Sequence, residues 1–96
     1  MNEVKVTTST GFKAEVDPRL QDDFDYADMV STLYGTGVGL SECIKHVIGA
    51  DGYEKIKKHC RGKDGFLSSK RVRKEFEEIV AGANVDEDLE VTVKNS

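Results

Sequence analysis

The sequence predicts an α+β domain in which an N-terminal β-hairpin packs on a bundle of three to four short helices. Near the start of the chain, apolar and polar residues alternate on both sides of a glycine-containing turn, which is typical of a hairpin. After it, apolar residues recur at helical spacing in four segments separated by glycines. A chain of 96 residues with 38% hydrophobic residues is large enough for one core only. We therefore expect one domain over residues 1–83, followed by an acidic segment, residues 84–96.

The hairpin is expected over about residues 3–17. One face of it is apolar, and a lone hairpin is only marginally stable in water, so this face has to pack on the helices. Asp17-Pro18 then ends the second strand, because proline lacks a backbone donor and favours a turn or the first turn of a helix. The side chains expected on the buried face are Val4, Val6, Phe12, Ala14 and Val16.

The four helices are expected at about residues 21–34, 41–48, 51–61 and 68–82. Carboxylates crowd the first turn of the first helix, where the helix dipole favours them. Its expected inward face holds Phe24, Ala27, Val30 and Leu33 or Tyr34, and the glycine-rich stretch 35–39 ends it. The later helices have the expected N-caps Ser41, Asp51 and Ser68.

The last segment, residues 84–96, shows no helical period. Val91 and Val93 alternate weakly with polar residues, so a short added strand and an acidic tail are both compatible with it.

The composition also indicates the cellular compartment in which we expect the protein. No stretch approaches the roughly 20 apolar residues of a membrane span, and the first 20 residues lack the pattern of a signal peptide. Cys43 and Cys60 are too few for the disulfide framework of a small secreted domain. We expect a cytoplasmic protein with reduced thiols and no membrane contact.

Charge is strongly segregated within a chain of net charge −4. Residues 55–74 hold nine Lys and Arg against Asp64 alone, a balance of +8, whereas residues 1–54 and 75–96 each sum to −6. Such a distribution favours steered binding of a charged partner, or head-to-tail self-association. We expect partner binding at a surface, here called the basic surface, made of Lys57, Lys58, Arg61, Lys70, Arg71, Arg73 and Lys74.

No pattern in the sequence predicts catalysis, a cofactor or a metal. The four soft ligands, Cys43, Cys60, His46 and His59, lack the close spacing of a zinc site. The Gly-x-Gly-x-Gly run at 35–39 fits neither the dinucleotide-binding fingerprint nor the P-loop, because no strand leads into it and no Lys-Ser/Thr follows it. The turn at Asp64-Gly65 fails as an EF-hand, because Arg71 stands where the bidentate glutamate is needed. We expect a binding protein and not an enzyme.

The order of these elements resembles the small tail assembly chaperones of long-tailed phages and prophages of Gram-positive hosts. The residues that carry the resemblance span about 4–80: Thr10-Gly11-Phe12-Lys13, Asp22-Asp23-Phe24-Asp25, Val47-Ile48-Gly49, Tyr53 through Arg61, Asp64-Gly65 and Val72 through Ile79. The resemblance implies a non-catalytic chaperone that coats the tape measure protein during tail morphogenesis, with other tail proteins as further partners. It implies action in the host bacterial cytoplasm and absence from the mature virion.

Two other function classes stay open at this stage. A small nucleic-acid-binding or regulatory domain would use the basic segment 55–74 to neutralise phosphates, although the acidic chain and the lack of a recognition-helix pattern disfavour it. A structural connector of the tail or head would differ from a chaperone by remaining in the purified particle.

Overall fold

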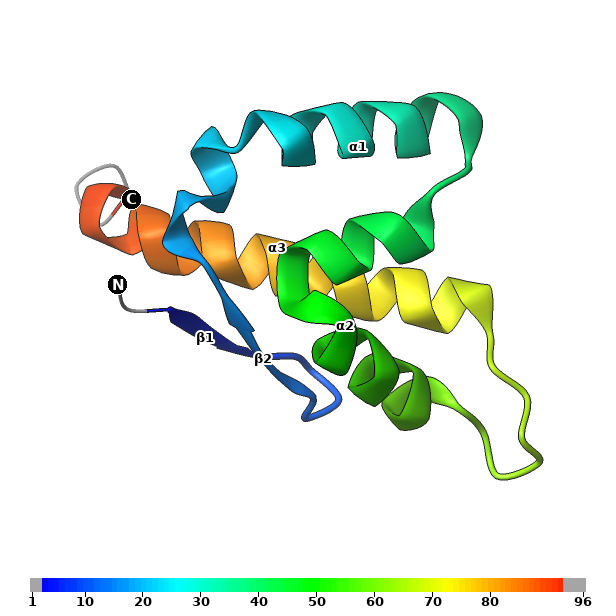
Figure 1. Cartoon of the computed structure of the whole chain (residues 1–96). Coiled ribbons are helices and arrows are strands. Elements are labelled where there is room, and N and C mark those ends of the chain that lie inside the picture. The colour runs from blue at the N-terminus through cyan, green and yellow to red at the C-terminus, as the bar shows by residue number, and fades with distance from the viewer. Residues whose placement is uncertain (1–2, 93–96) are drawn as a thin grey trace.

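A computed structural model describes the backbone of residues 3–92 and the side chains of residues 3–83. In chain order its elements are β1 (Val4–Thr7), β2 (Lys13–Val16), η1 (Pro18–Asp22), α1 (Phe24–Thr36), α2 (Leu40–Cys60) and α3 (Ser69–Thr92). The two strands form an antiparallel hairpin and the helices lie to one side of it (Figure 1). The predicted α+β class is therefore confirmed.

The hairpin has the predicted position and orientation. Val4 pairs with Val16 and Val6 with Ala14, and the inward side chains of Val6, Ala14 and Val16 are buried. Gly11 adopts a φ of 92° in the turn, a conformation that favours glycine. β1 packs on α3 and β2 packs on α2, so the helices supply the apolar cover that the hairpin requires.

The hydrophobic core lies between the hairpin, α2 and α3. At one point the backbone of α3 lies so close to the Val6 side chain of β1 that a Cβ on Gly82 would be 2.6 Å from Val6 Cγ1. α1 contributes much less, because Leu33 is its one buried residue. The buried core cluster comprises Val6, Phe12, Ala14, Val16, Leu20, Cys43, Ile44, Val47, Ile56, Cys60, Val72, Phe76, Ile79 and Ala83.

The start and the inward face of α1 differ from the prediction. Asp23 has extended backbone angles, and its Oδ1 accepts a hydrogen bond from the Tyr26 N–H at 3.2 Å, so α1 begins at Phe24. The residues before it form the separate 3₁₀ turn η1. The inward stripe is Tyr26, Met29, Val30 and Leu33, whereas Phe24 and Ala27 are exposed. Apolar residues occupy a wide arc of this helix, so their spacing alone does not fix its rotation.

α2 spans both the second and the third predicted helix. Gly49 has φ 82° and ψ 167°, which breaks the helix where the sequence predicts a break, and Figure 1 shows the chain turning sharply there. The predicted cap is wrong for the first half: Gly39 occupies the N-cap position, and the Ser41 hydroxyl lies 2.9 Å from the Tyr53 hydroxyl across the bend.

α3 begins as predicted, with the Ser68 hydroxyl accepting a hydrogen bond from the Arg71 N–H at 3.2 Å. It continues to Thr92 instead of ending near residue 82. Residues 84–92 therefore form neither the acidic tail nor the added strand expected for them, and residues 93–96 lie outside the described residues. None of the helices within residues 3–92 is long and apolar enough to cross a membrane.

Candidate partner-binding surfaces

The basic surface is built from the end of α2 and the first two turns of α3. Lys57 and Lys58 lie in the last turn of α2, where positive charge complements the helix dipole. With Arg61 they line an open groove of about 530 Å³ that also has acidic groups, Asp51 and Glu54, on its wall. The groove is thus not uniformly positive.

Four residues of the basic surface are engaged within the molecule. Arg61 Nη1 donates to the Gly65 carbonyl at 2.9 Å, and Arg71 Nη1 donates to the Cys60 carbonyl at 3.2 Å. Both bonds brace the connection between α2 and α3. Lys57 Nζ lies 4.6 Å from the centre of the Tyr53 ring, and the Arg73 guanidinium lies 5.9 Å from that of Tyr34. These contacts are of the cation–π type.

The other three residues, Lys58, Lys70 and Lys74, are exposed. Among the side chains that the structure describes, they have no hydrogen-bond or ion-pair partner. Charges in this position attract an anionic partner at long range, and salt weakens that attraction. The predicted residues thus divide into four that make contacts within the molecule and three that make none with the described side chains.

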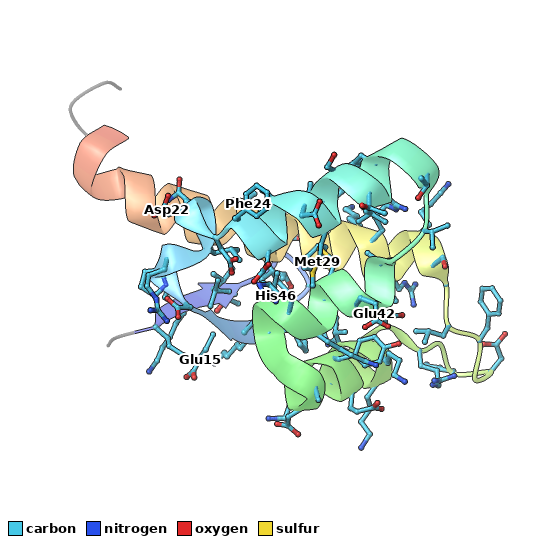
Figure 2. The ribbon with its side chains drawn as sticks, turned by 45° about the horizontal axis from the view of Figure 1, so that its top comes forward. Glu15, Asp22, Phe24, Met29, Glu42 and His46 are labelled. Atoms are coloured by element: carbon cyan, nitrogen blue, oxygen red, sulfur yellow. The ribbon has the colours of Figure 1, made fainter. Side chains whose placement is uncertain are left out.

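A second surface, which the sequence does not predict, is an apolar groove between α1 and α3. We call it the α1–α3 groove, and it exists because α1 packs mainly on α2 and makes few contacts with α3. Figure 2 shows Met29 directed from α1 toward α2, whereas Phe24 lies on the outer side of the same helix. The groove encloses about 220 Å³ and is lined by Tyr26, Val30, Tyr34, Phe76, Glu77, Val80 and Ala81.

The rim of the α1–α3 groove carries both polar and aromatic groups. The Tyr34 ring is 61% exposed, and its hydroxyl donates to Glu77 Oε2 at 3.3 Å. Tyr26 also lines the groove, and burial raises its pKa to about 12, so its phenol stays uncharged at physiological pH.

A polar clasp fastens the hairpin turn to the helices. The Thr10 hydroxyl donates to Glu75 Oε2 at 2.8 Å and lies 2.8 Å from His59 Nε2. The Thr10 hydroxyl thus links the Glu75 carboxylate to the His59 ring. Next to this, Ser9 donates its N–H and its hydroxyl to Glu78 at 2.7 and 2.9 Å.

Glu75 is the unusual residue of the clasp, because a carboxylate normally faces water. It is 2% exposed, and its Oε1 lacks a partner among the described atoms. One signal for it was present in the sequence: Glu75 follows Val72 at i+3 and precedes Ile79 at i+4, which places it on the apolar stripe of α3. Its Oε2 accepts a hydrogen bond from Thr10 in the hairpin turn, so we assign Glu75 to the fold.

His46 lines a separate groove near the start of α1, together with charged residues such as Asp17 and Asp23. Its Nε2 is 2.8 Å from Asp23 Oδ2, and this contact is the main cause that lowers the pKa of Asp23. The Arg19 side chain likewise lowers the pKa of Asp17 to about 2. Figure 2 places His46 on α2, facing this start of α1. The His46–Asp23 pair joins α2 to the start of α1, whereas the Arg19–Asp17 pair is local to the start of η1. Both carboxylates are already engaged.

The two thiols are poor candidates for chemistry. Cys43 and Cys60 are both buried and unpaired, and burial raises the pKa of each thiol. The reactive thiolate form is therefore disfavoured. Among the side chains of residues 3–83, no group of three His, Cys, Asp or Glu lies close enough together to hold a metal ion.

No family model, curated protein or solved structure matches this chain. The functional argument consequently depends on the surfaces themselves.

Proposed function

We propose that the protein is a non-catalytic phage tail assembly chaperone that binds the tape measure protein while the tail is built. The observation that carries the proposal is the α1–α3 groove, whose apolar floor and exposed Tyr34 suit an anchor side chain of a helical client. Its action would be in the host bacterial cytoplasm, and it would be absent from the mature virion. Other tail proteins are secondary partners in this proposal.

The size of the groove supports a protein client over a small molecule. At about 220 Å³ it falls below the roughly 300–1,000 Å³ of typical small-molecule pockets. One large apolar side chain fits such a volume, and amphipathic helices bind grooves through a few anchors spaced one turn apart. Tyrosine and arginine are also the residue types most often found at the centre of protein interfaces, and Tyr34 and Arg73 meet at this rim.

The charge pattern supports the same proposal. Residues 20–44 have no Lys or Arg and carry the acids Asp22, Asp23, Asp25, Asp28 and Glu42. A client helix with an apolar stripe flanked by Lys or Arg would therefore be attracted to α1 and then held by apolar contact. The core beneath, made by the hairpin, α2 and α3, would act as a fixed support for this binding face.

The test is co-expression with the tape measure protein of the same phage, followed by a pull-down at low and at high salt. We expect the client to stay soluble and to be retained through both washes. Ala81→Gln places a longer side chain on an exposed position of the groove wall, and we expect it to reduce retained client several-fold. Ala50→Gln makes the same change on an exposed helical position of α2 and should leave retention unchanged.

Loss of the client at every salt concentration, with the wild-type domain shown to be folded, would overturn the proposal. Equal retention by the two glutamine variants would remove the α1–α3 groove as the client site.

A nucleic-acid-binding function is the second candidate, and the free Lys58, Lys70 and Lys74 favour it. Three phosphate contacts would make the logarithm of the binding constant fall with a slope of about −3 against the logarithm of salt concentration. Titration of duplex DNA at several salt concentrations tests it. Tight, steeply salt-dependent binding without client retention would replace the chaperone proposal.

A further inference from the structure

The hairpin leaves part of the main chain of its second strand without partners. In an antiparallel pair, residues that exchange main-chain hydrogen bonds alternate with residues whose N–H and C=O groups point away from the partner strand. Thr8 N–H donates to the Phe12 carbonyl at 2.8 Å, so these facing residues are of the bonded kind. By the register of the hairpin, the residues of β2 that point outward are then Lys13 and Glu15. Within the described residues, no main-chain hydrogen bond from another element reaches them.

A groove runs beside this edge, between β2 and the bend of α2. It encloses about 410 Å³ and is lined by residues of both elements. On the helix side, a Cβ on Gly49 would meet nothing within 4 Å, so the main chain of a further strand can come close to the bend. Val47 and Ile48 supply apolar surface on the same side. The groove therefore provides space for an extended segment next to the unpaired edge of β2.

The groove carries negative charge that no basic side chain neutralises. Two of its acids, Asp17 and Asp51, already have basic partners. Glu3 and Glu15 have none among the described side chains, and a hydrogen bond with the Glu15 carboxyl raises the pKa of Glu3. Since two neighbouring carboxylates repel each other when both are charged, a cation beside them is favoured. A Lys or Arg across from Glu15 on an added strand would supply that cation.

The side chains of β2 also determine which strand can be added. Lys13 and Glu15 are exposed and alternate with the buried Ala14 and Val16, and Figure 2 shows Glu15 pointing away from the body of the molecule. A short edge strand with charged side chains resists indiscriminate pairing. A strand with a base across from Glu15 gains a cross-strand ion pair, whereas an acid in that place is repelled. The edge is therefore selective and not merely open.

We propose that an extended segment of a partner protein adds to the edge of β2 as an antiparallel third strand, with Lys or Arg across from Glu15. In this mode of recognition, main-chain hydrogen bonds supply affinity and alternate side chains supply specificity. The β2 edge and the α1–α3 groove have no lining residue in common, so this inference does not depend on the chaperone proposal.

The probe is the capped peptide Thr-Val-Lys-Val-Glu-Val-Thr, titrated into the protein while the amide NMR signals are followed. As an antiparallel third strand it places its lysine across from Glu15 and its glutamate across from Lys13, with the valines on the face of Ala14 and Val16. We expect the largest shifts at the amides of Lys13 and Glu15. Two methylated peptides separate strand pairing from attraction between charges. N-methyl groups on its lysine and glutamate block the N–H groups that face β2 and should abolish binding, whereas N-methyl groups on its valines should leave binding intact.

Variants of the protein test the same edge. Glu15→Pro deletes an outward N–H without breaking a bond of the hairpin, and proline is tolerated at such edge positions. It should lower the affinity for the peptide by about ten-fold, because a hydrogen bond and an ion pair are lost together. Glu15→Gln keeps the N–H and should lower the affinity only a few-fold. Lys5→Pro deletes the outward N–H on the other edge of the hairpin and should leave the affinity unchanged.

Three results would overturn the inference. The first is the absence of shifts at Lys13 and Glu15 in wild type. The second is binding of the peptide methylated on its lysine and glutamate as strong as that of the peptide methylated on its valines, and this comparison decides even where Glu15→Pro does not fold. The third is a concentration-dependent shift of the same signals without peptide, which would assign the edge to a second copy of the chain. Client retention is measured separately, so failure here is distinguishable from failure of the chaperone proposal.

Discussion

The hairpin–α3 side and α1 are two regions of one small domain with very different degrees of burial. On the first side, strand residues such as Val16 and helix residues such as Ile79 are fully buried, and the polar clasp seals the turn of the hairpin. In α1, Leu33 alone is buried, Phe24 is exposed on the outer side, and Tyr34 is exposed at the rim of the α1–α3 groove. The region with the proposed client site is the region that contributes least to the core.

Under the proposed function, this difference in burial has a physical reason. A domain of this size has a limited core, so an element whose apolar residues bind a partner cannot also pack fully against its own chain. Elements that bind ligands are commonly drawn from the less stable parts of a fold. We therefore expect α1 to exchange its amide protons faster than the hairpin and the first turns of α3.

The largest expected effect comes from truncating the core under the hairpin. Ile79→Ala should lower the free energy of unfolding by about 2–5 kcal/mol, because Ile79 is fully buried and its loss leaves a cavity. Met29→Ala removes a side chain of similar size from the half-buried face of α1 and should cost clearly less. Urea unfolding of both variants measures the difference. Equal costs would mean that α1 is as tightly integrated as α3.

The same contrast explains what the sequence could and could not predict. Strand alternation in the hairpin has a period of two and a fixed inward face, so Val6, Ala14 and Val16 were predicted correctly. For α1, Phe24 was expected inward and is the most exposed large apolar residue among those described. The rotation of a helix with a wide apolar arc is decided by tertiary packing, here that of Met29 and Leu33.

The candidate binding surfaces were predicted only in part, for a related reason. Positive charge between residues 55 and 74 is visible in the sequence, but the bonds that engage Arg61 and Arg71 depend on how the α2–α3 connection folds. The α1–α3 groove is formed by residues about 50 positions apart, such as Val30 and Val80, so no local pattern contains it. The end of α3 at Thr92 was missed because its last turns lack an apolar period.

A smaller effect comes from adding one methyl group to a glycine in each region. Ala in place of Gly82 would put a Cβ 2.6 Å from Val6, and such overpacking costs about 1–3 kcal/mol, partly offset by the better helix propensity of alanine. Gly35→Ala meets nothing within 4 Å and should stabilise α1 by up to about 1 kcal/mol. Both variants gain helix propensity. The difference between the urea unfolding midpoints of Gly82→Ala and Gly35→Ala therefore measures the steric clash with Val6. A stabilised Gly82→Ala variant would show that β1 moves away from α3 easily.

The smallest expected effect concerns the carboxylate that holds the hairpin turn. The Ser9 N–H and hydroxyl lower the pKa of Glu78, so the charged form is favoured in the folded state. A depressed folded pKa contributes stability above the unfolded value of about 4.3, and this contribution is lost as pH falls through the folded pKa. Glu78→Gln should therefore have a lower melting temperature than wild type near neutral pH, and the gap should close in acid. Asp23→Asn offers the matched measurement at the α1 end, where His46 lowers the pKa of Asp23. A gap for Glu78→Gln that is constant with pH would mean that the clasp acts through shape and hydrogen bonding and not through charge.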